Sequence, residues 1–498
     1  MKKYKYEIIL LVVDAICMIL ELVASRLLSP YFGNSNIVWT SVIGIILLSG
    51  SIGNYFGGII ADTDNTEKKL KEILIFSAIA ILIIPIMQKN ILTDISNLIP
   101  NIKIAAILAT IFLFFIPSLL MGLMSPIILK LKLQTLETAG KTSGTINAIA
   151  TIGGITGTFL GGFFLIPHFG SVQILYILCI ILLFLIPIVD FKFSLKSTIV
   201  IIFITVISLT MLFIYDNNNI SNSEKVLSGL KNIYVSYDTE YGRVLIYNIE
   251  RDGEPIRMLN IDSGFESATY ISENKINELV FNYTKFYDLM FKGNIEIQNT
   301  LLIGGAGYSY PKYFISHYKD KNMDVVEIDP KITEIAKKYF YLDKLIEDYN
   351  LEENNRLNLI TEDGRTYLNS NTKKYDAILN DAFSGSSPAK TLTTLEAAQK
   401  IKASLTENGL YLTNVISSFE GKSSQFLKAE LNTLKQVFKN TYVIPCDTVN
   451  NLEKPFNIMV IATDDTLYFE ENHPINLDES EIILTDNFCP IDTLIPQK

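Results

Sequence analysis

Glycine and acidic residues recur at successive positions in the second half of the chain, and their spacing indicates a nucleoside-binding site. Gly304, Gly305 and Gly307 follow the apolar run at residues 300–303, and Glu327 ends the next apolar run. Glycines allow the backbone to approach a ligand closely, and a carboxylate about twenty residues later accepts hydrogen bonds from ribose hydroxyls. The pattern predicts that an adenosine-like ligand binds here.

Further acids follow later apolar runs in the same manner. Asp363 and Gly364 come after residues 357–361, and Asp381 comes after residues 377–379. Ligands of an open parallel sheet bind beyond the carboxyl ends of its strands, so these residues are expected at one edge. Packing at strand tips does not require carboxylates, and the ordered set therefore favours a functional site.

Structural roles remain open for each acid. Glu327 and Asp329 precede Pro330, and an acid before a proline at the first helical position is ordinary capping chemistry. Asp363 and Asp381 belong to a residue type that is common in turns.

The elements that must hold these residues alternate between strand and helix, which predicts a mostly parallel sheet covered by helices on both faces. The expected strands are residues 300–303, 324–328, 357–361, 377–379 and 410–415, with a helix at residues 330–340. Upstream, alternating segments at residues 232–237, 243–248 and 255–261 predict a small antiparallel sheet.

The first part of the chain is dominated by Ile, Leu, Phe and Gly and predicts a polytopic helical membrane bundle. A spanning helix needs roughly 20 apolar residues, and about seven runs qualify, the third short and the fourth broken near Pro117. The runs are residues 8–28, 38–60, 73–87, 104–128, 144–166, 172–189 and 198–215. The expected domains are a transmembrane bundle at residues 1–216, a linker with a small β-domain at 217–290, and a Rossmann-like nucleoside-binding domain at 291–498.

Two of these runs share a glycine motif. Gly53-x-x-x-Gly57-Gly58 in the second run recurs as Gly157-x-x-x-Gly161-Gly162 in the fifth. Small residues four apart let helices approach closely in lipid, so the motifs are interpreted as packing seams. Their recurrence half a bundle later suggests two three-helix units, as in half of a transporter of the major facilitator type.

Charged residues occur inside the first run. Asp14 and Glu21 lie on one face of the expected helix, and Arg26 follows near its end. Carboxylates inside a membrane are costly and usually face a partner or a watery cavity. An ion pair with Arg26 and a role in a transport pathway both remain open.

The placement of lysines predicts the orientation of the bundle. With the N-terminus in the cytoplasm, Arg26, Lys89 and Lys103 lie outside, and the many other basic residues near the runs lie inside. Seven crossings then put the C-terminal domain outside the cell, unless the third or fourth run fails to cross. In an outside location, Cys446 and Cys489 could form a disulfide.

Composition excludes two function classes. The net charge is −10 and no basic stripe offsets the acids, which excludes nucleic acid as the main partner. The four cysteines have no CxxC spacing, and three histidines are too few for a histidine cluster, so no metal is expected.

In its motifs the chain resembles spermidine synthase and its relatives. The matching segments are Gly304-Gly305-Ala306-Gly307, Val325-Val326-Glu327-Ile328-Asp329-Pro330, Glu362-Asp363-Gly364-Arg365, and residues 375–381, 392–396 and 408–411. Residues 241–244 and 259–264 resemble the small β-domain of this family. Residues 21–30 and 39–44 resemble its membrane-fused members, the fused major-facilitator/spermidine synthase type.

The resemblance implies a role for each matching residue. Asp381 would orient and deprotonate an attacking amine, Glu327 would bind the ribose hydroxyls, and Asp363 would bind the adenine amino group. The remaining residues that it implicates are Gly304, Gly305, Gly307 and Gly364 in the nucleoside site, and Ser384 and Pro388 in the substrate loop. The ligand would be decarboxylated S-adenosylmethionine or S-adenosylmethionine itself.

The chain departs from the family at four positions. Gly307 and Ser384 stand where the family has aspartates, Gly242 stands for a glutamine, and Asn282 or Tyr283 for a histidine. All four changes fall on the amine and propyl side. A dicationic amine needs carboxylates to offset its desolvation, so nucleoside binding is better supported than putrescine as acceptor.

We therefore expect a membrane-anchored aminopropyltransferase, in contact with the lipid bilayer and with a small-molecule amine acceptor that is not assigned. Its side of the membrane and its state as monomer or homodimer are left open. One alternative is a membrane transporter whose soluble domain is a nucleoside-binding sensor without turnover. Another is a methyltransferase on the same fold.

Overall fold

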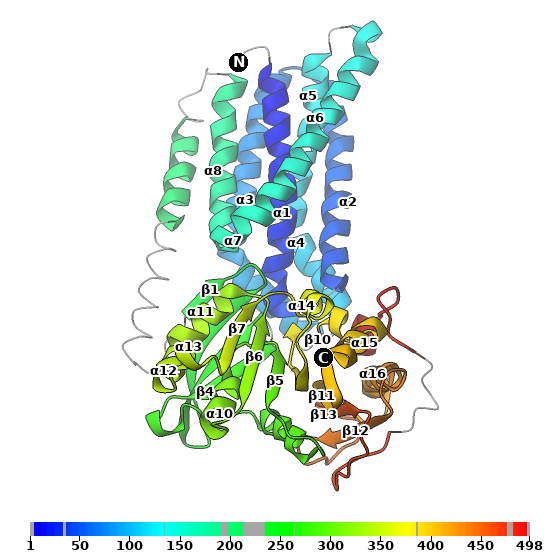
Figure 1. The fold of residues 1–498 in the computed structure, drawn as a ribbon. Helices are drawn as coiled ribbons and strands as arrows, with labels where there is room; N and C mark the ends of the chain where they lie inside the picture. Colours follow the sequence, from blue (N-terminus) through cyan, green and yellow to red (C-terminus); the bar gives the residue numbers. More distant parts are fainter. Residues whose placement is uncertain are drawn as a thin grey trace. The chain divides into compact units, whose positions relative to one another are not determined.

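The computed structural model describes residues 4–32, 36–133, 135–190, 198–212, 235–262, 264–384, 387–475 and 482–495. The chain divides into two compact units (Figure 1). The first comprises Met1–Ser223 with Ser236–Arg243, and the second comprises Glu224–Val235 with Val244–Lys498.

The first unit is a bundle of long helices. These are α1 (Lys5–Phe32), α2 (Asn36–Ala61), α3 (Thr66–Leu98), α4 (Ile102–Gly122), α5 (Met124–Lys132), α6 (Ala139–Leu160), α7 (Ile166–His168) and α8 (Ser171–Val189). Among the described residues, six helical segments are long and apolar enough to cross a membrane, which is compatible with a membrane-spanning region. The last expected span corresponds to a shorter apolar helix at Thr198–Leu212, and residues 213–215 lie outside the described part.

The structure corrects two expectations about these runs. The third run is not short, because polar residues at both ends extend α3 to 33 residues. The fourth does not break at Pro117: α4 continues to Gly122, and the break lies at Leu123. Membrane helices tolerate proline where other groups satisfy the freed backbone. A Cβ on Gly122 would lie 2.6 Å from the Gly50 carbonyl oxygen, so the break coincides with a close approach to α2.

The glycine motifs form the seams of the bundle. A Cβ on Gly53 would lie 2.3 Å from the Leu119 carbonyl oxygen, and one on Gly157 would lie 2.3 Å from that of Ala15. Gly53 therefore lets α2 pack on α4, and Gly157 lets α6 pack on α1. If α1–α3 form one unit of three spans and α4–α8 form a second, the middle spans of the two units are α2 and α6. Each middle span then packs on the first helix of the other unit, α2 on α4 and α6 on α1. The packing interpretation is confirmed, and the pairing fits the repeat.

Arg26 has partners other than Glu21. Its guanidinium donates to the backbone carbonyls of Thr239 and Glu240, within the same unit. The neighbouring Asp238 carboxylate accepts the Ser171 N–H at 3.0 Å. The roles of Asp14 and Glu21 stay as predictions.

Replacing Gly157 by Ala is expected to lower the stability of the bundle by about 1–3 kcal/mol, because the new methyl would overlap the Ala15 carbonyl. Thermal unfolding of the full-length protein in detergent measures this. Gly162→Ala is the matched control, since nothing lies within 4 Å of a Cβ there. Equal losses of stability in the two variants would contradict the role of Gly157 in helix packing.

A four-stranded sheet precedes the large parallel sheet in the chain, in the order β1-β2-β3-β4. Its strands are β1 (Val235–Asp238), β2 (Arg243–Arg251), β3 (Glu254–Ile261) and β4 (Gly264–Tyr270). The pairs β2/β3 and β3/β4 are antiparallel, as expected. β4 was not anticipated, and residues 232–234 of the expected first strand lie outside the described part.

The second unit is built on a seven-stranded sheet in the order β12-β13-β11-β8-β5-β6-β7. Its strands are β5 (Asn299–Ile303), β6 (Asn322–Glu327), β7 (Leu357–Thr361), β8 (Tyr375–Asn380), β11 (Leu405–Ser417), β12 (Asn440–Pro445) and β13 (Phe456–Thr463). The five expected strands pair in parallel, which confirms the Rossmann-like fold. β12 and β13 add an antiparallel extension that the strand–helix alternation did not predict.

Helices flank this sheet (Figure 1). They are η5 (Asn282–Lys292), α10 (Ser309–His317), α11 (Pro330–Tyr339), α12 (Leu342–Asp348), α13 (Leu351–Asn354), α14 (Gly364–Ser370), α15 (Leu395–Ser404), α16 (Gln425–Lys435) and α17 (Ile491–Leu494). The expected helix at residues 330–340 is α11.

Candidate functional site

The strand ends that carry the expected site residues meet at one edge of the sheet. The Gly304 N–H donates to the Val326 carbonyl at 2.9 Å, and the Asp381 N–H donates to the Ile303 carbonyl at 2.9 Å. The Glu362 N–H donates to the Glu327 carbonyl at 3.1 Å. The turns after β5, β6, β7 and β8 are therefore adjacent, as the strand-end argument predicts.

The turn after β5 requires its glycines for steric reasons. Gly304 has φ +98°, and a Cβ there would lie 2.6 Å from the Asp381 carbonyl oxygen. A Cβ on Gly307 would lie 2.6 Å from Ser267 Oγ, on β4. The turn thus runs against the Asp381 backbone on one side and against β4 on the other.

Glu327 organises this turn. Its Oε2 accepts the N–H groups of Gly305 and Ala306 at 2.9 and 3.0 Å, and its Oε1 accepts the Asp329 N–H at 3.0 Å. Burial raises the pKa of Glu327, and the three backbone hydrogen bonds oppose that rise. The carboxylate therefore fixes the shape of the turn.

Two of the other expected residues also have structural roles. Asp329 caps α11 by accepting the Lys331 N–H at 2.9 Å, so the capping alternative is confirmed for it. Asp363 caps α14 by accepting the Thr366 N–H at 2.9 Å through one carboxylate oxygen. A Cβ on Gly364 would lie 2.5 Å from Ile303 Cγ2, so this glycine allows close packing of α14 on the sheet.

Asp381 is the acid with the environment of a base. Tyr283 Oη donates to its Oδ2 at 3.1 Å. Burial raises the pKa of Asp381 to about 6, and hydrogen bonds from Tyr287, Tyr283 and Asn414 hold it from rising further. A carboxylate with this pKa can accept a proton near neutral pH.

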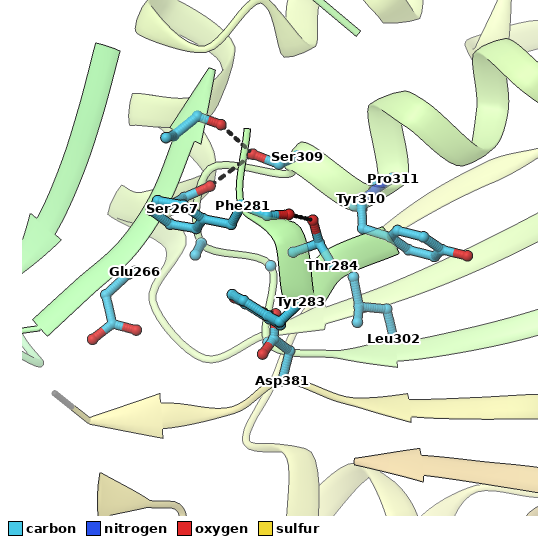
Figure 2. Close-up of a pocket in the computed structure, with 14 residues that line it drawn as sticks. Glu266, Ser267, Phe281, Tyr283, Thr284, Leu302, Ser309, Tyr310, Pro311 and Asp381 are labelled. Atoms are coloured by element: carbon cyan, nitrogen blue, oxygen red, sulfur yellow. Dashed lines mark hydrogen bonds between the residues drawn. The ribbon is translucent and has the colours of Figure 1, made fainter. Parts of the chain in front are cut away.

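Asp381 opens into a pocket shared by the small sheet, η5 and the glycine turn (Figure 2). Its lining residues are Glu266, Ser267, Ala268, Phe281, Tyr283, Thr284, Leu302, Gly304, Gly305, Ala306, Ser309, Tyr310, Pro311 and Asp381. Of Asn282 and Tyr283, Tyr283 is the one that reaches Asp381, whereas Asn282 donates to the Cys446 carbonyl at 2.5 Å.

The loop after Asp381 forms a short hairpin. β9 (Phe383–Ser384) pairs with β10 (Ser387–Pro388), and the Ala389 N–H donates to the Ala382 carbonyl at 3.1 Å. Pro388 is buried in this hairpin, whereas the Ser384 side chain and residues 385–386 lie outside the described part. The closure of this loop over a ligand stays a prediction.

The disulfide considered for Cys446 and Cys489 is absent from the described residues. Cys446 and Cys489 are free thiols, as are the other two cysteines. Cys446 lies beside the Asn282 side chain, and Cys489 lies 3.7 Å from Thr393 Oγ1. The two cysteines thus have different neighbours in the fold.

Sequence reasoning missed three residues at the site: Tyr287, Asn414 and Glu266. Asn414 lies in β11, and its Oδ1 is buried without a partner among the described residues. It lies near the end of the expected strand at residues 410–415, which could have pointed to it. Tyr287 and Glu266 had no comparable signal, since their elements were not expected.

Comparisons with known proteins find similarity in the C-terminal half of the chain. Residues 288–470 match the model of the spermine/spermidine synthase domain. The C-terminal half carries a spermine/spermidine synthase domain. Among solved structures, the chain is similar to a probable spermidine synthase from Corynebacterium glutamicum, with 20% identity, 47% of this chain and 82% of that chain covered, and a TM-score of 0.39. It is similar to the spermidine synthase from Thermotoga maritima, with 16% identity, 52% and 83% covered, and a TM-score of 0.37.

Relatives of similar sequence are named polyamine aminopropyltransferase. The one from Vibrio vulnificus is 29% identical over 40% of this chain and 71% of its own length. Those from Methanocaldococcus jannaschii and Saccharolobus islandicus are 28% and 27% identical over 39% and 42% of this chain. The chain covers 60% and 65% of these two proteins, which is less than two thirds of their length.

Replacing Glu327 by Gln is expected to loosen the glycine turn, because an amide offers one acceptor oxygen where the carboxylate offers two. The lost backbone hydrogen bonds correspond to about 1–3 kcal/mol of local stability. Hydrogen exchange at Gly305 and Ala306 measures this and should accelerate. Glu353→Gln, at an exposed position of α13, is the control. Unchanged exchange in the Glu327 variant would contradict the role.

Proposed function

We propose that the C-terminal half transfers an aminopropyl group from decarboxylated S-adenosylmethionine to an amine. The comparisons support an enzyme of the aminopropyltransferase type and leave the acceptor unspecified. The observation that carries the proposal is Asp381, a carboxylate with a pKa of about 6 that lines the pocket beside the glycine turn.

The chemistry requires little from the protein besides position and a base. The acceptor nitrogen attacks the propyl carbon attached to the sulfonium, a C–N bond forms as the C–S bond breaks, and the electron pair moves to sulfur. Methylthioadenosine leaves as a neutral thioether, and the surplus proton on nitrogen passes to Asp381. Holding the two reactants together accounts for much of the rate, because the sulfonium is already activated.

The nucleoside side of the site follows the same proposal. Glu327 binds the ribose hydroxyls with the acceptor capacity that its three backbone bonds leave, and Asp363 binds the adenine amino group through the oxygen that does not cap α14. Gly304, Gly305 and Gly307 let the backbone approach the ligand. Support comes from the adjacent strand ends and from the steric need for Gly304 and Gly307.

Asp381→Asn is expected to lower turnover by roughly 10²–10⁴-fold while the Kd for methylthioadenosine stays the same, because the amide cannot accept the proton. In the parent protein, kcat/KM should rise with pH through about 6, since Asp381 acts only when deprotonated. Product analysis with radiolabelled donor and calorimetry with methylthioadenosine measure the two effects. Binding without turnover in the parent would favour the sensor, and transfer of a methyl group would favour the methyltransferase.

We also propose that Thr198–Leu212 crosses the membrane as a seventh span. Asp190, just after α8, pairs with Lys71 at 3.4 Å, and Lys5 donates to the Val189 carbonyl at 2.9 Å. The chain therefore leaves α8 beside the start of α1. Arg26 and Ser171, at the opposite ends of α1 and α8, bond to residues of the Ser236–Arg243 segment. Between these points the chain has to traverse the bundle.

An odd number of crossings puts Arg243 on the side opposite the N-terminus, which the lysine distribution assigns to the outside. A tag placed after Lys498 is then expected to be cleaved when protease is added to intact cells. A tag before Met1 is the control and should be cleaved only after lysis. Protection of the C-terminal tag in intact cells would refute the seventh crossing.

A further inference from the structure

Glu266 is the extra residue of a β-bulge in β4. Leu259 of β3 is opposite Ser267, and the next residue, Asn260, is opposite Phe265, so Glu266 has no counterpart in the ladder. A bulge re-aims the side chain of the extra residue and often occurs next to active sites. Here it turns a carboxylate towards the pocket that contains Asp381.

Glu266 and Asp381 line this pocket from different elements. Figure 2 shows Glu266 extending from its strand and Asp381 beside the ring of Tyr283. Burial raises the pKa of Tyr283 well above its usual value, and the charges of Asp381 and Glu266 raise it further. Both carboxylates are therefore close enough to act on the same phenol.

The pocket has an acidic lining. Its described lining residues include two carboxylates, Glu266 and Asp381, and no lysine, arginine or histidine. Two carboxylates in a partly desolvated space are stabilised by a cation that enters with the ligand. The lining therefore favours a ligand with positive charge in addition to its reacting atoms.

The surroundings of Gly307 connect Glu266 with the departures from the spermidine synthase pattern. A Cβ on Gly307 would lie 2.6 Å from Oγ and 2.8 Å from Cβ of Ser267, so Ser267 occupies the space that a longer residue at position 307 would need. Ser267 in turn donates or accepts a hydrogen bond with Ser309 at 2.8 Å, which fixes β4 against the start of α10. The residue next to Ser267 is Glu266. The turn thus has no carboxylate at position 307, and the adjacent strand β4 supplies one at Glu266.

We propose that Glu266 binds a primary ammonium group of the ligand and determines specificity for it. The inference rests on the proposed aminopropyl transfer and assigns the cation-binding residue of the same site. The ammonium has two sources with the same chemistry, the aminopropyl arm of the donor nucleoside and the distal amine of a diamine acceptor.

The test compares Glu266→Gln with Glu250→Gln in the full-length protein. Glu250 is exposed on β2 and lies outside the set of residues that line the pocket. Calorimetry measures Kd for decarboxylated S-adenosylmethionine and for methylthioadenosine, which lacks the arm. Initial rates measure kcat/KM for 1,4-diaminobutane and for 1-aminobutane, which lacks the second amine. Glu266→Asp, which keeps the charge, is expected to retain part of the parent's selectivity.

Two ratios are compared: the affinity for decarboxylated S-adenosylmethionine relative to methylthioadenosine, and kcat/KM for 1,4-diaminobutane relative to 1-aminobutane. In Glu266→Gln one of these ratios is expected to fall roughly 10–100-fold, and in Glu250→Gln both should be unchanged. A reduced preference for the decarboxylated donor over methylthioadenosine assigns the ammonium to the donor arm, and a reduced preference for the diamine assigns it to the acceptor. Unchanged ratios, with methylthioadenosine still bound at the parental Kd, overturn the role of Glu266. If the parent protein itself binds neither nucleoside, the result contradicts the proposed aminopropyl transfer, on which the role of Glu266 rests.

Discussion

Three backbone N–H groups converge on the Glu327 carboxylate, and the geometry of the site depends on this interaction. Gly305 and Ala306 donate to one oxygen and Asp329 to the other. The glycine turn is therefore tied to the end of β6, while Gly304 brings it against the Asp381 backbone. A buried carboxylate without these donors would be costly, and a turn without the carboxylate would have unsatisfied N–H groups. The carboxylate and the glycine turn therefore stabilise each other.

Asp381 is positioned by a second group of contacts. Tyr283 and Tyr287, which hold the pKa of Asp381 near 6, both belong to η5. Asp288 on the same helix accepts hydrogen bonds from three tyrosine hydroxyls, those of Tyr310, Tyr313 and Tyr318, at 2.8, 3.1 and 3.0 Å. Tyr310 and Tyr313 belong to α10, which begins at the glycine turn. Helix η5, which contacts Asp381, is thus joined to α10, which starts at the glycine turn.

The parts of the site that follow from local sequence were predictable, and the parts that follow from register were not. Glycines and acids just after apolar runs identify strand ends, and these pair as expected because parallel strands share one edge. The dual role of Asp363 as helix cap and ligand candidate is also local. Glu266 depends on a bulge between β3 and β4, and the choice of Tyr283 over Asn282 depends on where η5 packs. Neither leaves a periodic signal in the chain. The break at Leu123 likewise lies beside the close approach to Gly50, six residues beyond the proline.

The bulge in β4 has a consequence for the solution behaviour of the protein. β4 is the last strand of its sheet, and an outer strand with an uninterrupted ladder is a template on which another chain can add. The extra residue at Glu266 interrupts that ladder, and its charge makes the strand a poor template. The same irregularity that directs a side chain towards the pocket therefore also makes this outer strand less regular as a template for a further strand.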